Sequence, residues 1–275
     1  MPDVTAVQTR LERHLPRGWR DFWLQFAIFW LFYAAYEGTR GVSDGARREA
    51  FATAERLVEA QRDLGIFWEL DVQAWALDAP DLVMTIANWT YFNCQFTISY
   101  GFMLWAYFRR NHAWYFMRNV LIVAGFIGLA GYVAYPTAPP RMFPELGFVD
   151  TLNDTAVNHE SGIIETFANP YAAMPSLHTA YALIIGISGL LITRHLAVRL
   201  MWALYPSLVV FSIVATANHW LLDAVAGAFV AIAAGMVGLA LTRGVLPRRG
   251  RAPAGPLVRE RGIRHAPVPA SAVGD

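Results

Sequence analysis

Six long apolar stretches divide this 275-residue chain, and they constrain its fold more than any other feature. Each is about 17 to 27 residues long, the length of an α-helix that crosses a hydrocarbon core about 30 Å thick. The composition agrees, because the chain is 56% hydrophobic and only 16% charged. We expect membrane-spanning helices at Trp19–Tyr36, Leu82–Phe108, Trp114–Tyr135, Met174–Thr193, Leu200–Ala217 and Trp220–Leu241. The predicted fold class is an all-α polytopic membrane protein with six transmembrane helices over residues 19–241.

The segments between the apolar stretches complete the predicted organisation. Residues 1–18 are polar and form an N-terminal segment, and residues 242–275 form an Arg- and Pro-rich tail that we expect to be disordered. Residues 37–81 lie between the first and second spans and include an amphipathic helix, which predicts helices lying along the membrane interface. They form either a packing platform or a gate for substrate. Residues 136–173 form a loop between the third and fourth spans.

The distribution of arginine predicts how the chain is oriented in the membrane. The basic residues are all Arg. When the N-terminus is placed inside, most of them fall on the cytoplasmic side, as the positive-inside rule requires. We therefore expect a multi-pass cell-membrane protein with both termini in the cytoplasm. The 136–173 loop and the starts of the fourth and sixth spans then face outward.

Three short segments contain the residues that could take part in catalysis, and all three are predicted on the outer face. They are Tyr135-Pro-Thr-Ala-Pro-Pro-Arg141, Pro175-Ser-Leu-His178 and His219-Trp-Leu-Leu-Asp223. Asp223 stands alone in a long apolar stretch, where a carboxylate is costly unless it is paired, so its default interpretation is functional. It follows His219 by four residues and lies on the same side of a helix. That pattern is typical of a nucleophile or base with its orienting acid, although a structural hydrogen bond is the alternative.

These segments, in this order, resemble the type 2 phosphatidic acid phosphatase (PAP2) superfamily. The third motif of that superfamily has a His followed by an Asp after three residues, and its second motif is usually Pro-Ser-Gly-His. The variant Pro-Ser-Leu-His, with Tyr-Pro-Thr-Ala-Pro-Pro upstream, is more similar to the branch that contains inositol phosphorylceramide synthases. The resemblance covers about Leu82 to Leu241.

The resemblance implies metal-independent phosphoryl transfer through a phosphohistidine, with no cofactor. By position, His219 is the nucleophile, Asp223 holds its ring, His178 is the general acid and Arg141 clamps phosphate oxygens. The residue types suit this chemistry, because imidazole exchanges protons near neutral pH and a guanidinium matches phosphate oxygens in a bidentate way. For Arg141, snorkelling at the membrane interface is the alternative.

Four further residues are candidates for substrate binding. Ser176 either caps a helix or donates a hydrogen bond to phosphate, and Asn218 has the same two alternatives. Tyr135 is expected to form part of the wall of the site, and Tyr171 leads into the second motif and is a candidate lining residue. Other polar loop residues, among them Asp150, Asp154 and His159, are expected on a solvated face without a metal site.

Two departures from the superfamily pattern bear on the substrate. Ala134 stands where the first motif has a Lys, and Ile213 stands where the third motif has an Arg. Fewer cations suit a less charged phosphodiester, so we expect a headgroup transferase acting on a phospholipid or other lipid-linked phosphate among membrane lipids. The alternative is a lipid phosphate phosphatase, and a non-catalytic transporter or scaffold is a third hypothesis. Nothing in the sequence indicates a nucleotide, a redox cofactor or a nucleic-acid partner.

Overall fold

The computed structural model describes residues 15–43, 46–152 and 171–245. Within these ranges the regular elements are helical, and one isolated bridge joins Thr137 to Ala172, which confirms the predicted all-α class. The predictions on His159, Asp154 and residues 246–275 lie outside the described residues. The elements are α2 (Gly18–Ser43), α3 (Arg47–Asp63), α4 (Glu69–Asp78), α5 (Asp81–Asn93), η1 (Cys94–Ile98), α6 (Ser99–Arg109), α7 (Asn111–Ala134), η2 (Pro140–Met142), η3 (Pro144–Leu146), α9 (Leu177–Ile192), α10 (Leu196–Ala215) and α11 (Leu221–Val245).

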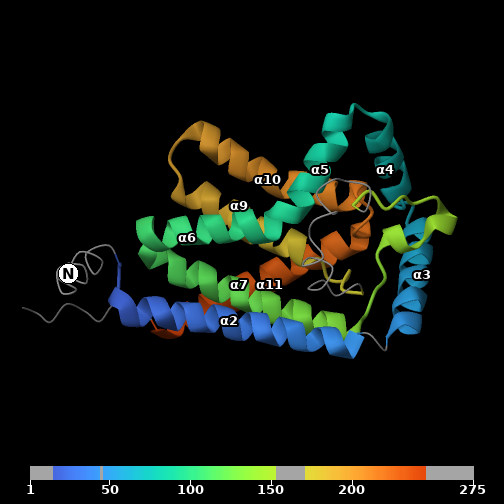
Figure 1. Cartoon of the computed structure of the whole chain (residues 1–275). Helices are drawn as coiled ribbons and strands as arrows, with labels where there is room; N and C mark the ends of the chain where they lie inside the picture. The colour runs from blue at the N-terminus through green and yellow to red at the C-terminus, as the bar shows by residue number, and fades with distance from the viewer. Residues whose placement is uncertain (1–14, 44–45, 153–170, 246–275) are drawn as a thin grey trace, which may run out of the picture.

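The long helices form a bundle, and α3 lies across one end of it (Figure 1). Three helices in the described part of the chain are long and apolar enough to cross a membrane, namely α7, α10 and residues 221–241 of α11. α9 is apolar but shorter. Large apolar side chains such as Leu204 and Phe229 are exposed on these helices, as contact with lipid requires. These helices indicate a membrane protein. That it has six spans stays a prediction.

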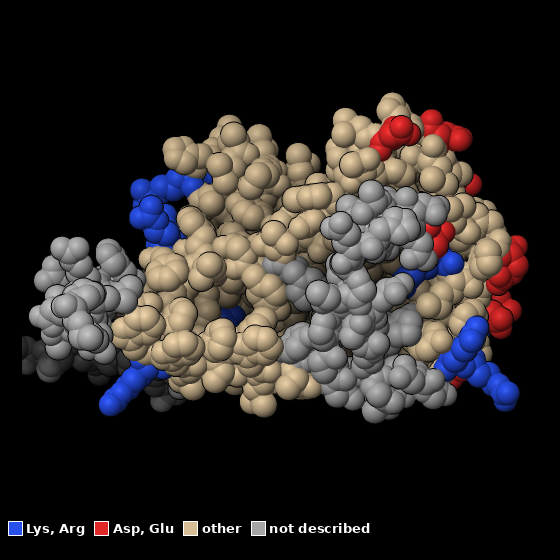
Figure 2. Space-filling view, viewed as in Figure 1, with Lys and Arg blue, Asp and Glu red and all other residues tan. Residues whose placement is uncertain are grey.

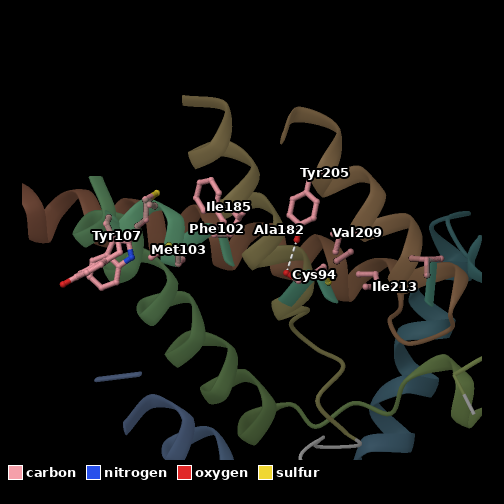
Figure 3. Packing of buried hydrophobic residues seen from close by; sticks show 14 residues of the cluster. Cys94, Phe102, Met103, Tyr107, Ala182, Ile185, Tyr205, Val209 and Ile213 are labelled. Carbon is pink, nitrogen blue, oxygen red and sulfur yellow. Dashed lines mark hydrogen bonds between the residues drawn. The ribbon is translucent and has the colours of Figure 1, made fainter. Parts of the chain in front are cut away.

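A π-helical turn divides the predicted second span into two helices. Cys94–Ile98 forms this turn, with α5 before it and α6 after it. The Cys94 carbonyl accepts a hydrogen bond from Ser99 Oγ at 2.8 Å. It also accepts one from the Tyr205 hydroxyl at 3.0 Å (Figure 3). These side chains satisfy a carbonyl group that the wider turn displaces from the regular helical pattern.

The centre of the bundle is packed by apolar side chains from α6, α9 and α10 (Figure 3). Ile185, Val209 and Ile213 are fully buried there. Gly186 allows the backbones of α9 and α10 to approach closely, because a Cβ at this position would lie 2.9 Å from the Trp202 carbonyl oxygen. Close packing through small residues is a main source of helix association in membranes.

The predicted amphipathic helix is α3, and together with α4 it covers the end of the bundle that holds the motif residues. We call residues 47–78 the α3–α4 platform. Its apolar face, which includes Ala54, Leu57 and Val58, packs against Phe148 and Trp220 in one buried cluster. The amphipathic helix is confirmed, whereas its position along a membrane interface stays a prediction.

Candidate active site

Backbone hydrogen bonds bring the three motif segments together beneath the platform. The Arg141 N–H donates to the Ala217 carbonyl at 2.8 Å, which joins the first segment to the residues before His219. The Ser176 N–H donates to the Asp223 carbonyl at 3.0 Å, which joins the second segment to the third. Side chains far apart in the chain are therefore placed by main-chain contacts.

Ser176 places His178 in the first turn of α9. Its Oγ accepts a hydrogen bond from the Thr179 N–H at 3.3 Å, and its side chain is fully buried. This is the N-cap arrangement, which satisfies one of the free N–H groups at the start of a helix. The structure shows one of the two predicted roles of Ser176, that of the helix cap.

The two histidines contact each other, and a backbone carbonyl orients the pair. His219 Nδ1 lies 2.8 Å from the Ala173 carbonyl oxygen, and His219 Nε2 lies 3.3 Å from His178 Nδ1. Because a carbonyl only accepts, Nδ1 of His219 carries the proton and its Nε2 holds a lone pair. His178 then donates its Nδ1 proton toward that lone pair.

Burial keeps His219 neutral. The residue is 4% exposed, and this burial lowers its pKa to about 3. The positive charge of Arg141 acts in the same direction, while the hydrogen bond to the Ala173 carbonyl opposes it. An imidazole that is unprotonated at physiological pH has the lone pair that a nucleophile needs.

Asp223 lies beside the His219 ring and also caps its own helix. Its Oδ2 is 3.5 Å from His219 Nδ1 and accepts a hydrogen bond from the Trp220 N–H at 2.8 Å. The carboxyl group is fully buried, and its Oδ1 has no hydrogen-bond partner within the described part of the chain. The close partner of the His219 ring is thus Ala173, which the sequence did not predict, with the carboxylate as a neighbour.

Arg141 is held by two side chains. One guanidinium nitrogen, Nη1, donates to Asn218 Oδ1, and Nε lies 3.8 Å from Asp150 Oδ2. Asn218 in turn donates from Nδ2 to the Thr216 carbonyl at 3.0 Å. Asn218 therefore links Arg141 to the backbone before His219, and its two predicted roles stay predictions. Asp150 was expected on a solvated face and instead lies next to Arg141.

The two candidate tyrosines contact α3 and the buried cluster around Trp220. The Tyr135 side chain is 45% exposed, and its ring centroid is 6.0 Å from the guanidinium carbon of Arg56 on α3. Tyr171 accepts a backbone hydrogen bond from Thr137 and packs on the buried cluster around Trp220. The substrate-binding roles of Tyr135 and Tyr171 stay predictions.

One aromatic residue next to the site escaped sequence reasoning. The ring of Tyr91, from α5, stacks on the His178 ring with centroids 4.8 Å apart and planes inclined by 19°. This contact fixes the orientation of the His178 ring. Tyr91 lies within an apolar stretch and belongs to no motif, so no signal in a single sequence could have identified it.

Comparison with known proteins matches the chain to one family. A family model described as the PAP2 superfamily matches residues 55–237, more than half of the chain. The match begins in α3 and ends in α11, so it spans His178, His219, Asp223 and Arg141. No curated protein and no solved structure matches the chain.

Proposed function

The chain belongs to the PAP2 superfamily, and from this premise we propose that it transfers a phosphate-linked group between lipids through a phosphohistidine. Membership supports a phosphatase or phosphotransferase kind of function. The observation that carries the proposal is the neutral His219, whose Nε2 lone pair lies 3.3 Å from the Nδ1 atom of His178. A nucleophile and a proton donor are thus adjacent in a buried site.

In the first step, His219 Nε2 attacks phosphorus and forms an N–P bond. The P–O bond to the leaving alcohol breaks, and His178, protonated to the imidazolium beside the anionic phosphate, gives a proton to that oxygen. Arg141, held by Asn218, neutralises charge on the non-bridging phosphate oxygens. The buried Asp223 carboxyl group beside Nδ1 stabilises the cationic ring that forms.

In the second step, an acceptor hydroxyl group attacks the phosphohistidine. His178, now a neutral imidazole, takes the proton of that hydroxyl group as the N–P bond breaks. His219 returns to its neutral form and His178 to its imidazolium form. A lipid alcohol as acceptor gives a new phosphodiester lipid. Water as acceptor gives the phosphatase reaction of the alternative hypothesis.

A phosphodiester suits this site better than a phosphomonoester. Ala134 ends α7 without a charge, and Ile213 is fully buried in the apolar packing of α10, so neither position supplies a cation. A phosphodiester carries less negative charge than a monoester and needs fewer cations. This favours a headgroup transferase of the inositol phosphorylceramide synthase type.

An apolar groove of about 550 Å³ supports a lipid-linked substrate. It lies between α4, α9, α10 and α11, and its lining includes Thr179, Val214, Leu221 and Ala224. Thr179 and Ala224 directly follow His178 and Asp223 in the chain. We expect hydrocarbon to fill this groove when the protein is in a membrane.

The experiment uses purified protein in EDTA with a panel of phospholipids and polyprenyl phosphates. We expect a new phosphodiester lipid, detected by mass spectrometry, and little free phosphate. His219→Ala should lower turnover by at least about 10²- to 10⁴-fold, because it removes the proposed nucleophile. His195→Ala is the matched control, since His195 is exposed before α10.

The outcomes separate the hypotheses. Free phosphate that disappears in His219→Ala would identify a phosphatase. Undiminished turnover in His219→Ala would exclude the phosphohistidine, and a complete absence of turnover on every lipid would favour the non-catalytic transporter or scaffold. Persistence of activity in EDTA is part of the expected result.

A further inference from the structure

Side chains of the α3–α4 platform cap the helix that follows His219. The Leu221 N–H donates to Glu69 Oε1 at 2.6 Å, across 152 positions of sequence. The Leu222 N–H donates to Gln61 Oε1 at 3.0 Å, across 161 positions. The first N–H groups of a helix have no partner within the helix, so these two side chains satisfy donors that would otherwise be buried without one.

A third platform side chain holds the chain just before His219. Gln73 Nε2 donates to the Ala215 carbonyl at 3.2 Å and to the Val149 carbonyl at 2.9 Å. Gln73 Oε1 accepts from the Val149 N–H at 2.9 Å. The platform therefore contacts the backbone on both sides of His219, at the end of α10 and at the start of α11.

These side chains are buried at a free-energy cost. Gln61 and Glu69 are both fully buried. Glu69 Oε2, Gln61 Nε2 and Asp223 Oδ1 have no hydrogen-bond partner within the described residues. Apolar residues at positions 61 and 69 would avoid this cost, but they would leave the Leu221 and Leu222 N–H groups without acceptors. The two buried polar side chains therefore secure the start of α11.

We propose that Glu69, assisted by Gln61, is a positioning residue that holds the first turn of α11 so that His219 and Asp223 stay aligned with His178. The inference rests on the proposed function, because alignment matters only if these residues react together. Glu69 acts through the Leu221 amide and not on the reacting phosphate. Two side chains of the platform, Glu69 and Gln61, then support the reacting residues, although the platform contains none of the three motifs.

This role requires the hydrogen-bond acceptor oxygen of Glu69. It does not require the negative charge of the side chain. Burial raises the pKa of Glu69, and the nearby Asp223 acts in the same direction, while the hydrogen bond from Leu221 opposes both. A neutral carboxyl group still offers its carbonyl oxygen to the Leu221 N–H. The amide of Glu69→Gln offers the same acceptor in the same shape, whereas Glu69→Leu offers none.

The test compares Glu69→Gln and Glu69→Leu with Asp71→Leu as a matched control. Asp71 is an exposed carboxylate in the first turn of the same helix, α4. We expect Glu69→Gln to keep kcat within about threefold of the unaltered protein. Glu69→Leu should lower kcat about 10- to 100-fold with little change in KM, the size expected for an unsatisfied buried donor at the site. Asp71→Leu should change neither constant.

Hydrogen exchange gives a readout that needs no turnover. Peptides that contain the Leu221 and Leu222 amides should exchange faster in Glu69→Leu and normally in Glu69→Gln and Asp71→Leu. Equal loss of activity in Glu69→Gln and Glu69→Leu, with normal exchange in both, would overturn the proposal, because the carboxyl group itself would then be needed. Unchanged exchange and unchanged kcat in Glu69→Leu would also overturn it.

Failure of the proposed function has a different signature. The unaltered protein would then show no turnover, and faster exchange in Glu69→Leu would still show that Glu69 holds the start of α11. A normal rate of hydrogen exchange in Glu69→Leu would show that Glu69 does not hold the start of α11, whether or not the protein is active. Melting temperatures of all variants in detergent identify any variant that has simply unfolded.

Discussion

A neutral carbonyl, that of Ala173, holds the Nδ1 proton of His219. A full hydrogen bond from Nδ1 to a carboxylate would favour the charged ring, whereas a carbonyl favours it much less. With Asp223 at 3.5 Å, the carboxyl group is close enough to stabilise a ring that becomes charged during the reaction. The resting ring therefore stays neutral, and in the mechanism that we propose the stabilisation becomes important only once the N–P bond has formed.

The same burial predicts that acid destabilises the protein through His219. Its folded pKa of about 3 lies below the ordinary value of 6.5, so the unfolded chain binds the proton more tightly. The contribution of neutral His219 to the free energy of unfolding is at its full value above pH 6.5. It decreases as pH falls toward 3, by at most about 1.4 kcal/mol per pH unit. His219→Gln should show a shallower decrease of melting temperature between pH 7 and pH 4 in detergent. Equal slopes in His219→Gln and the unaltered protein would contradict this, and exposed His195→Gln serves as control.

At the scale of elements, the active-site geometry depends on how closely α11 approaches the start of α9. A Cβ at Gly227 would clash with the Ser176 carbonyl oxygen and lie 3.1 Å from Thr179 Cβ. The contact is with backbone, which cannot move without displacing the cap of α9. The absence of a side chain at Gly227 thus sets the spacing between the helices that carry His178 and Asp223.

Gly227→Ala should therefore separate α9 from α11. We expect a loss of about 1 to 3 kcal/mol of stability, the usual cost of overpacking, and a loss of activity larger than that of most surface changes. Gly235→Ala is the matched control in the same helix, because a Cβ there meets nothing within 4 Å. Melting temperature and turnover of the two variants provide the comparison. If Gly227→Ala behaves like Gly235→Ala, this close approach has no role.

The sequence predicted those parts of the structure that depend on local pattern. Apolar length predicted the all-α class, and the apolar chain between His178 and His219 predicted that both lie at the same face, where the structure brings their rings into contact. The partners of Glu69, Tyr91 and Ala173 were not predictable, because each depends on a contact with a distant segment. The π-helical turn also escaped prediction, since the apolar pattern of residues 82–108 continues through it.

At the scale of the whole molecule, acidic side chains gather at one end of the bundle (Figure 2). Those seen in this view lie at the end that carries α3 and α4, where basic side chains also lie, whereas the charged side chains seen at the opposite end are basic. The loop between α6 and α7 begins at Arg110, and the loop between α9 and α10 contains Arg194. The basic end agrees with cytoplasmic termini and an outward-facing active site, the orientation that we propose.

Cysteine labelling tests this orientation in intact cells. The single cysteine, Cys94, is buried, so background labelling should be low. Glu59→Cys, at an exposed position of α3, should react with a membrane-impermeant maleimide added outside. His195→Cys should react only after permeabilisation. The reverse pattern would place the active site in the cytoplasm.

The π-helical turn at Cys94–Ile98 has a consequence for the evolution of the chain. Such a turn accommodates one residue more than an α-helix of the same rise, and each residue turns a helix by about 100°. A lineage that lost one residue here would gain a regular helix and rotate Tyr91 away from the His178 ring. Homologues of different length at this point must therefore support that histidine with a different residue, or leave it without an aromatic neighbour.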